Sequence, residues 1–372
     1  MKKQFYLLIT AFIALSLFFT ACNKEPDYFA DAIPSISAGA LANIVLQPAN
    51  TCGGIVTSNL IAGKDFDTPI GYVSVTQGEG DDFLTITYLI DKPGWFITET
   101  HFGVYDEWEN FPGYPLNPKI GNFNFNKDDH NYVTNFSFQI DLEDFVEPDD
   151  HTLSIMAHAT VINKGTCACP DDTKLPEEVD LLIHYPNAES YFGISISEGG
   201  ILNGDYDGWC SDDDKLIYRE TPYHAIVYSS INSEADLSSV VDRPENLYKV
   251  NYLLNKDLSA FTLGEIQMAL WTLLEPVGGV HDPGGLGPWI QTNVDAILAL
   301  TDGLTEFNPD CNNPYFAVLL QPIDPATGLP TVQPALIKYC TPGSETAWSA
   351  GNDFSISRSW AMWFPFTFCY PF

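Results

Sequence analysis

Apolar and polar residues alternate along most of the segment from about residue 70 to residue 185. The clearest runs are YVSVT, FLTITYLI, WFITETHFGVY, YVTNFSFQIDL, HTLSIMAHATVI and VDLLIHY. A period of two is typical of half-buried strands, and clusters of Gly, Pro, Asn and Asp separate the runs as turns would. The segment is therefore predicted to form an antiparallel β-sandwich. The stretch ETAWSAGNDFSISRSWAMWFPFTFCY at 345–370 is again β-like and aromatic.

The pattern changes between about 186 and 341. The apolar positions that keep a helical spacing in SAFTLGEIQMALWTLLEP are Leu263, Ile266, Leu270, Leu273 and Leu274. Pro276 ends this run, and a second helix is predicted over PWIQTNVDAILALTDGL, from near Pro288 to near Gly303. Two strands, YFAVLLQPI and PALIKYC, are predicted to follow. This block is therefore predicted to be α+β.

The N-terminus has the features of an export signal. Two lysines precede an apolar run from Phe5 to Phe19, and FTAC ends at Cys22. The segment resembles a bacterial lipoprotein signal, which implies that residues 1–21 are removed and Cys22 becomes the lipidated first residue. The following NKEPDYF resembles the tags of lipoproteins displayed on the outer membrane of Bacteroidetes-type bacteria. We therefore expect a lipid-anchored protein exposed at the cell surface, with residues 22–49 forming the anchor and a tether.

The charge balance narrows the choice of partners. The chain has 372 residues, with 16 Lys+Arg against 49 Asp+Glu and a formal net charge of −33. Such a surface repels phosphate backbones, so nucleic acid is not expected as a partner. Cations, basic proteins and the membrane, through the lipid, remain.

The cysteine count predicts one free thiol. Exported chains normally pair their cysteines. Lipidation of Cys22 leaves seven, so one unpaired cysteine leaves six for three disulfides, although the count does not identify which one is free. Cys167 and Cys169 are two residues apart, which favours two different partners over a bond with each other. The eight cysteines are Cys22, Cys52, Cys167, Cys169, Cys210, Cys311, Cys340 and Cys369.

Three segments suggest that the sandwich is discontinuous. TETHFGVY, IMAHATVIN and the terminal ETAWSAGNDF with SWAMWFPFTF resemble consecutive parts of one bacterial secreted β-domain. The resemblance implies a host domain of residues 50–185 plus 342–372 and an insertion of residues 186–341. Cys369 is then expected to bond back to the first half. The predicted fold class is mainly β, an antiparallel β-sandwich host with an α+β insertion.

The inserted block resembles the thioester domains of bacterial surface adhesins. The matching features are W-C-S-D around Cys210, the segment NYLLN, and the helix I-Q-x-A-L-W around Gln267. The resemblance implies that the Cys210 thiol and the Gln267 carboxamide condense into an internal thioester with loss of ammonia. Two features depart from the better-known pattern: Ile266 stands where those adhesins have threonine, and GWCSD differs from their aromatic-Cys-aromatic sequence.

The proposed chemistry explains the residue types. A thiol is nucleophilic enough to attack a carboxamide, and a helix fixes the orientation of that carboxamide. Tyr206, Trp209 and Trp271 are the candidate aromatic walls of a dry pocket. An amine on a partner protein or surface ligand then opens the thioester and forms an amide. This is single-use capture by an adhesin and not enzymatic turnover, and it requires no cofactor.

Two other interpretations of these residues remain open. In one of them, Gln267 is an exposed polar position and Cys210 forms a disulfide with Cys311 or Cys340. The protein is then a non-covalent structural or glycan-binding surface lipoprotein. In the other, NGDYDGWCSDDD has the spacing of a calcium loop. The candidate calcium ligands, which are compatible with a thioester, are Asn203, Asp205, Asp207 and Asp214.

Overall fold

The structure is a computed structural model that describes residues 52–63, 69–114, 118–144, 151–185, 191–276, 289–353 and 361–369. The expected signal 1–21, the lipidation site Cys22 and the tether 22–49 lie outside the described residues. Within the described part of the chain, no helix is long and apolar enough to cross a membrane.

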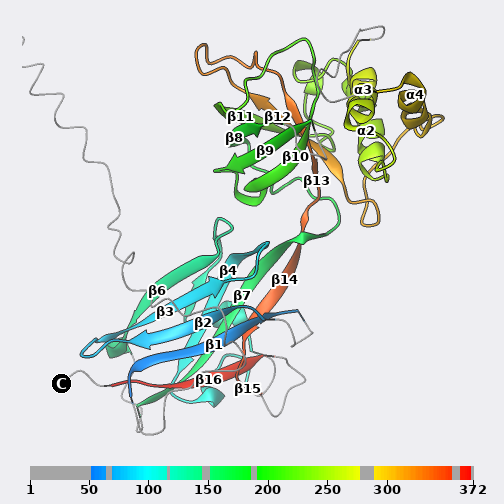
Figure 1. Cartoon of the computed structure of the whole chain (residues 1–372). Coiled ribbons are helices and arrows are strands. Elements are labelled where there is room, and N and C mark those ends of the chain that lie inside the picture. The colour runs from blue at the N-terminus through cyan, green and yellow to red at the C-terminus, as the bar shows by residue number, and fades with distance from the viewer. Residues whose placement is uncertain are drawn as a thin grey trace, which may run out of the picture. The chain divides into compact units, whose positions relative to one another are not determined.

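Ten strands of the described chain form one antiparallel sheet (Figure 1). Its path runs β15-β16-β7-β14-β1-β2-β3-β6, and β4 pairs with β7 and β5. The strands are β1 (Gly54–Ala62), β2 (Pro69–Gln77), β3 (Phe83–Ile90), β4 (Trp95–Tyr105), β5 (Phe125–Lys127), β6 (Asn135–Asp141), β7 (Thr152–Cys167), β14 (Pro342–Ser349), β15 (Asn352–Asp353) and β16 (Met362–Thr367). Strands from both ends of the described chain therefore share one sheet, because β14 pairs with β1 and with the long β7, and β16 pairs with β7.

Alternation along these strands places their apolar side chains in one core. In β3, partly buried and buried residues alternate strictly from Phe83 to Ile90, as the sequence period of two requires. The sheet curls over this core. Strands β3 and β4 are not neighbours in the sheet, yet Tyr88 of β3 packs edge-on against Phe102 of β4, with ring centroids 6.4 Å apart. The fold class expected from the sequence is confirmed at this level: the protein is mainly β, with antiparallel sheets.

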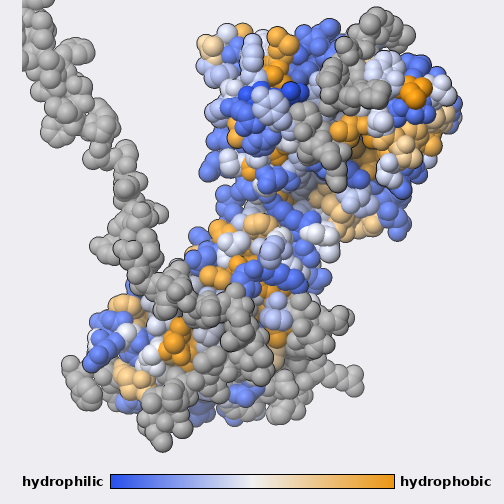
Figure 2. All heavy atoms as spheres, viewed as in Figure 1, coloured by the Kyte–Doolittle hydropathy of each residue, from blue (hydrophilic) through white to orange (hydrophobic). Residues whose placement is uncertain are grey.

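The second sheet is a closed barrel with the strand order β10-β13-β12-β11-β8-β9. Its strands are β8 (Glu178–His184), β9 (Phe192–Ser197), β10 (Gly204–Cys210), β11 (Pro222–Ser229), β12 (Phe316–Pro322) and β13 (Ala335–Tyr339). The helices between β11 and β12 are α2 (Leu247–Leu254), α3 (Leu263–Leu274) and α4 (Gln291–Ala299). Single 3-10 turns occupy Trp108–Asn110, Ile120–Asn122, Leu142–Asp144, Gly200–Leu202, Leu237–Ser239 and Pro244–Asn246. On the face shown in Figure 2, hydrophobic side chains are interspersed among hydrophilic ones.

One predicted strand joins a different sheet from the one expected. The sequence pattern predicts VDLLIHY as a strand of the sandwich, but it forms β8, which pairs with β9 and β11 in the barrel. Alternation identifies a strand and its buried face. It does not identify the strand's neighbours, which depend on contacts far away in the chain.

Helix α3 begins with a capping box. The Thr262 side chain accepts a hydrogen bond from the Glu265 backbone, and the Glu265 carboxylate accepts one from the Thr262 N–H. The same carboxylate accepts from Ile290 N and Asn293 Nδ2, at 3.2 and 2.7 Å, which fixes the start of α3 to the start of α4. The predicted second helix is therefore present, in the shorter range of α4.

The cysteine arithmetic is confirmed within the described residues. Disulfides join Cys52 to Cys369, Cys167 to Cys340, and Cys169 to Cys311. Cys167 and Cys169 therefore take different partners, and Cys369 bonds back to the start of β1, as expected. The free cysteine is Cys210, which is buried, so the alternative disulfides of Cys210 with Cys311 or Cys340 are excluded in this structure.

Candidate functional site

Cys210 lies where two barrel strands part. The ladder between β10 and β9 has its last pair at Gly208 and Phe192. A Cβ at position 208 would lie 2.3 Å from Ile194 Cδ1, so glycine lets β10 approach β9 closely just before the ladder ends. Two residues further on, Cys210 still lies opposite Ala335 of β13, but its N–H and C=O are hydrogen-bonded to a side chain of α3.

That side chain is Gln267. Its Oε1 accepts from Cys210 N at 2.9 Å, and its Nε2 donates to Cys210 O at 2.7 Å. Both residues are fully buried. The two hydrogen bonds hold the carboxamide in one orientation against the residue that carries the thiol. The structure therefore brings together the pair identified from the sequence, residues that are 57 positions apart.

Three groups surround the Cys210 sulfur. Trp271 Nε1 lies 3.2 Å from Sγ and Gln333 Nε2 lies 2.8 Å from it, each as a hydrogen-bond donor. The thiol itself donates to Asp212 O at 3.2 Å. Trp271 follows Gln267 by one turn of α3, so the two side chains lie on the same face of the helix.

Gln333 is the site residue that the sequence did not indicate. It lies between β12 and β13, 123 positions from Cys210, and its Nε2 also donates to Asp212 O at 2.8 Å. Its side chain is buried. Gln333 belongs to no recognisable motif. The one feature of the sequence that could have indicated it is its place beside a buried strand, where a polar side chain needs a hydrogen-bond partner.

Burial controls the acidity of the thiol. It raises the pKa of Cys210 to about 12, and the hydrogen bond from Trp271 opposes this shift. The thiolate is therefore rare at neutral pH. Whatever negative charge the sulfur acquires depends on the nearby N–H donors for stabilisation.

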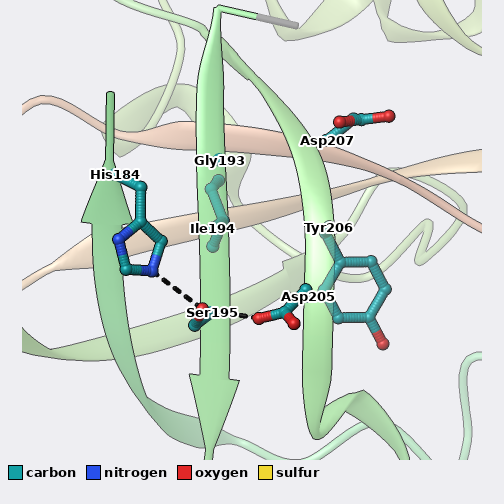
Figure 3. A pocket seen from close by; sticks show the side chains of 7 residues that line it. All are labelled: His184, Gly193, Ile194, Ser195, Asp205, Tyr206 and Asp207. Carbon is teal, nitrogen blue, oxygen red and sulfur yellow. Dashed lines mark hydrogen bonds between the residues drawn. The ribbon is translucent and has the colours of Figure 1, made fainter. Parts of the chain in front are cut away.

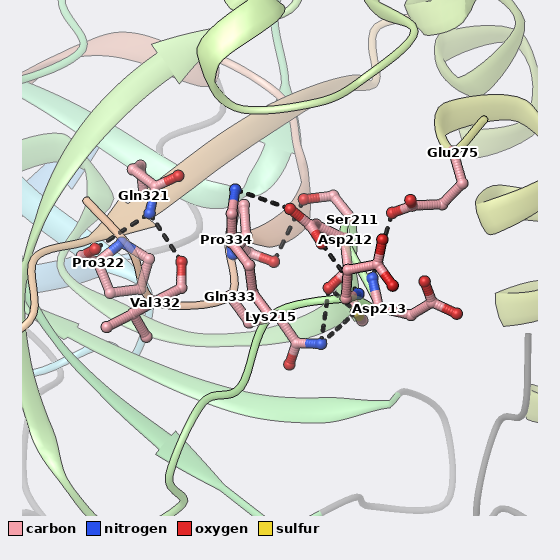
Figure 4. A network of polar contacts seen from close by, with 12 residues as sticks. Ser211, Asp212, Asp213, Lys215, Glu275, Gln321, Pro322, Val332, Gln333 and Pro334 are labelled. Carbon is pink, nitrogen blue, oxygen red and sulfur yellow. Dashed lines mark hydrogen bonds and ion pairs between the residues drawn. The ribbon is translucent and has the colours of Figure 1, made fainter.

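The residues after Cys210 form a fixed turn (Figure 4). Lys215 Nζ pairs with Asp212 Oδ2 at 2.7 Å, and Asp213 N donates to Glu275 Oε1 at 3.2 Å. Glu275 directly follows α3 and is 2% exposed. Its burial raises its pKa to about 7, and the carboxylates of Asp212 and Asp213 add to the shift.

A cavity of about 740 Å³ leads to this site. Trp271 and Gln333, the two donors to the sulfur, form part of its wall. The remaining lining residues are Tyr185, Tyr191, Phe192, Asp213, Asp214, Lys215, Leu216, Ile217, Tyr218 and Arg219. The side chains of Trp271 and Gln333 therefore lie between a small molecule in this cavity and the Cys210 sulfur, which both of them contact.

The three aromatic residues proposed as pocket walls occupy three places. Trp271 contacts the sulfur, as described. Trp209 lines an apolar pocket together with Ile266 and Leu270. It lies on the opposite face of β10 from Cys210, because successive side chains of a strand point to opposite faces. Tyr206 lines a third pocket, on β10. Ile266, the departure from the adhesin pattern, packs in the pocket of Trp209.

The four candidate calcium ligands are not gathered into one loop. Residues 204–210 form β10, which places Asp205 and Asp207 along an extended strand. Asn203 Oδ1 accepts from Gly199 N at 2.7 Å. Asp214 belongs to another group, in which oxygens of Asp213, Asp214 and Glu275 lie within 4.8 Å of one another.

Asp205 takes part in a polar chain across three barrel strands (Figure 3). His184 Nε2 lies 2.8 Å from Ser195 Oγ, and that hydroxyl donates to Asp205 Oδ1 at 2.6 Å. Glu220 Oε1 lies 3.3 Å from His184 Nδ1. The serine proton is directed to Asp205 and not to the imidazole, and Ser195 lies within a paired strand. The arrangement is therefore a surface hydrogen-bond chain rather than an activated nucleophile.

No protein-family model and no curated protein matches the sequence. Among solved structures, the chain is similar to the N-terminal domain of the Streptococcus pyogenes pilus tip adhesin Cpa, at 13% sequence identity and a TM-score of 0.29. The match covers 45% of this chain and 94% of that chain. A likeness of this TM-score decides neither the fold nor the function of this chain.

Proposed function

We propose that this protein is a surface capture module of the adhesin type, in which Cys210 and Gln267 form an internal thioester. The observation that supports the proposal is the double hydrogen bond between the Gln267 carboxamide and the Cys210 main chain, beside a free and buried thiol. A glutamine that served only as a polar surface position would be exposed, whereas Gln267 is fully buried.

The first step joins the two side chains. The Cys210 sulfur attacks the Gln267 carboxamide carbon, an S–C bond forms, and the C–N bond breaks. The thiol proton passes to the leaving nitrogen, which departs as ammonia. Cys210 N, which donates to Oε1 at 2.9 Å, is placed to stabilise the negative charge that develops on this oxygen in the tetrahedral intermediate.

The second step is capture. A partner's neutral amine attacks the thioester carbon, an amide bond forms to Gln267, and the thiolate that leaves takes up the proton lost by the amine. The N–H groups of Trp271 and Gln333 stabilise that thiolate. Until then, exclusion of water protects the thioester from hydrolysis. Each molecule reacts once, so the protein is not an enzyme in this proposal, and the reaction requires no cofactor.

The expected lipid anchor at Cys22 gives this chemistry its setting. A capture module held at the outer membrane, exposed at the cell surface, meets proteins and surface ligands of other cells, and a net charge of −33 favours basic ones. The second candidate is a non-covalent structural or glycan-binding lipoprotein. In that case Gln267 serves as a cap on the edge of β10, a role that the same two hydrogen bonds fulfil.

Intact mass combined with thiol titration distinguishes these two candidates. We expect the folded, disulfide-bonded protein to lack the mass of one ammonia and to show no titratable thiol under denaturing conditions. In Cys210→Ala and in Gln267→Ala this deficit should be absent, so that each variant has the full mass calculated from its own sequence. The thiol titration is essential, because an amide between Lys215 and Gln267 would remove the same mass but leave the thiol free. Full mass with one titratable thiol would contradict the proposal.

A further inference from the structure

The cavity beside the thiol has an exposed apolar rim. Tyr185 is 67% exposed, Leu216 is 73% exposed and Tyr218 is 68% exposed. Among the described residues eight large hydrophobic side chains are exposed. These three are the most exposed of the eight, and they line the same cavity as Trp271 and Gln333. Scattered apolar residues need no explanation, but a group of them around one opening is typical of a binding surface.

The composition of the rim is that of a protein interface. Tyrosine and arginine are enriched at interface centres, where they provide large contact areas with few rotatable bonds. Arg219 completes the group, since its guanidinium lies over the Tyr185 ring at 5.4 Å from the ring centroid. This stacking holds both side chains in place before any partner arrives.

The charges in the wall select the kind of partner. Asp213 and Asp214 line the cavity, and Asp214 is exposed. The cations in the wall are already engaged, Lys215 with Asp212 and Arg219 with the Tyr185 ring. An incoming ammonium therefore meets carboxylates and aromatic faces, both of which attract cations.

We propose that this cavity docks a protein segment in which a lysine is flanked by apolar or aromatic residues, and that the rim of Tyr185, Leu216 and Tyr218 binds the flanking residues. The inference rests on the proposed thioester and names the partner of that same site. The volume of about 740 Å³ falls within the range of pockets that hold a molecule of several functional groups. Methylamine would fill a small part of it and leave the rim unused.

Two probe peptides test the role of the rim. Both are acetylated and contain one lysine, which is flanked by phenylalanines in one peptide and by glycines in the other. We expect the wild-type protein to form the covalent adduct about tenfold faster with the phenylalanine peptide, since a hot-spot contact has an effect of this order. Both peptides carry the same amine, so the ratio reports only the contacts of the flanking residues.

Variants locate these contacts. Leu216→Ala and Tyr218→Ala should abolish the preference for the phenylalanine peptide, with the rate of each peptide divided by the methylamine rate of the same variant. The matched control is Leu329→Ala, because Leu329 is 55% exposed and does not line the cavity. Asp214→Asn should slow both peptides, because it removes a carboxylate that attracts the ammonium.

The outcomes separate this inference from the proposed function. A wild-type protein that retains its ammonia and reacts with no amine contradicts the thioester itself. A protein that reacts with methylamine but shows no preference between the peptides overturns the docking inference alone. Equal preference in wild type and in both rim variants also overturns it, and so does a faster reaction with free putrescine than with either peptide, since the cavity would then serve small amines.

Discussion

Replacing Gln333 by leucine tests whether the hydrogen-bond donors around the Cys210 sulfur accelerate the opening of the proposed thioester. Gln333→Leu keeps a side chain of similar size but removes the N–H donor that lies 2.8 Å from Cys210 Sγ. The Asp212 carbonyl loses the same donor but accepts from the Cys210 thiol while the protein folds, before the thioester forms. The barrel should therefore fold, with one fewer donor aimed at the sulfur.

The expected effect follows from the charge that the sulfur carries as a leaving group. A hydrogen bond to a charged group contributes about 1.5–3 kcal/mol, and each 1.4 kcal/mol corresponds to about a factor of ten. Trp271 Nε1 remains as the second donor, at 3.2 Å. We therefore expect the opening of the thioester by methylamine to slow by about 10- to 100-fold in Gln333→Leu.

The assay follows the methylamine adduct by intact mass at fixed pH and amine concentration. The fraction of protein that has already lost ammonia is measured first, and the rate is taken on that fraction alone, so thioester formation and opening are separated. Gln321→Leu is the matched control: Gln321 is another buried barrel glutamine, and its Nε2 donates to Pro322 O and Val332 O instead of the sulfur. Equal rates in Gln333→Leu and wild type would refute this reasoning, and so would equal slowing in both variants.

Three further predictions concern stability and ionisation. Burial raises the Glu275 pKa from 4.5 to about 7. This group therefore contributes stability that is present below pH 4.5 and lost as the pH rises through 7. The free energy of unfolding, measured with urea, should decline over this range in wild type and decline less in Glu275→Gln. Burial lowers the pKa of His158 to about 3, so its imidazole should stay neutral between about pH 5 and 8, where an unperturbed histidine titrates. Its NMR chemical shift should then be constant over this range, and a transition near pH 6.5 would contradict the burial. Replacing both Cys52 and Cys369 by serine removes a disulfide with a sequence separation of 317 and should cost about 3–5 kcal/mol in the free energy of unfolding, whereas an unchanged urea midpoint would show that other contacts hold the chain end.

The sequence predicted the elements better than their neighbours. The period of two along FLTITYLI matches the burial pattern of β3 residue by residue, because a strand half-buried on one face requires that pattern. The same period in VDLLIHY predicted a strand but not its place in the barrel, which pairing with β9 and β11 decides. Local patterns carry no information on partners more than 40 residues away, as in the pairing of Asp180 with His224.

The site was predictable where its residues lie close together in the sequence. Gln267 and Trp271 are one helical turn apart, so their common face follows from the helix period. Trp209 could have been assigned to the opposite face from Cys210 by strand alternation. Gln333 has no such neighbour, because its position beside the sulfur arises from the closure of the barrel, which brings the turn before β13 to the end of β10.

The measurement that tests the thioester most directly is the site of amine attachment. The folded protein is treated with methylamine, digested, and sequenced by tandem mass spectrometry. We expect one methylamide on Gln267 and a new free thiol on Cys210, with no label on Gln333 although its nitrogen lies 2.8 Å from the sulfur. No adduct, or an adduct on Gln333 instead of Gln267, would contradict the account.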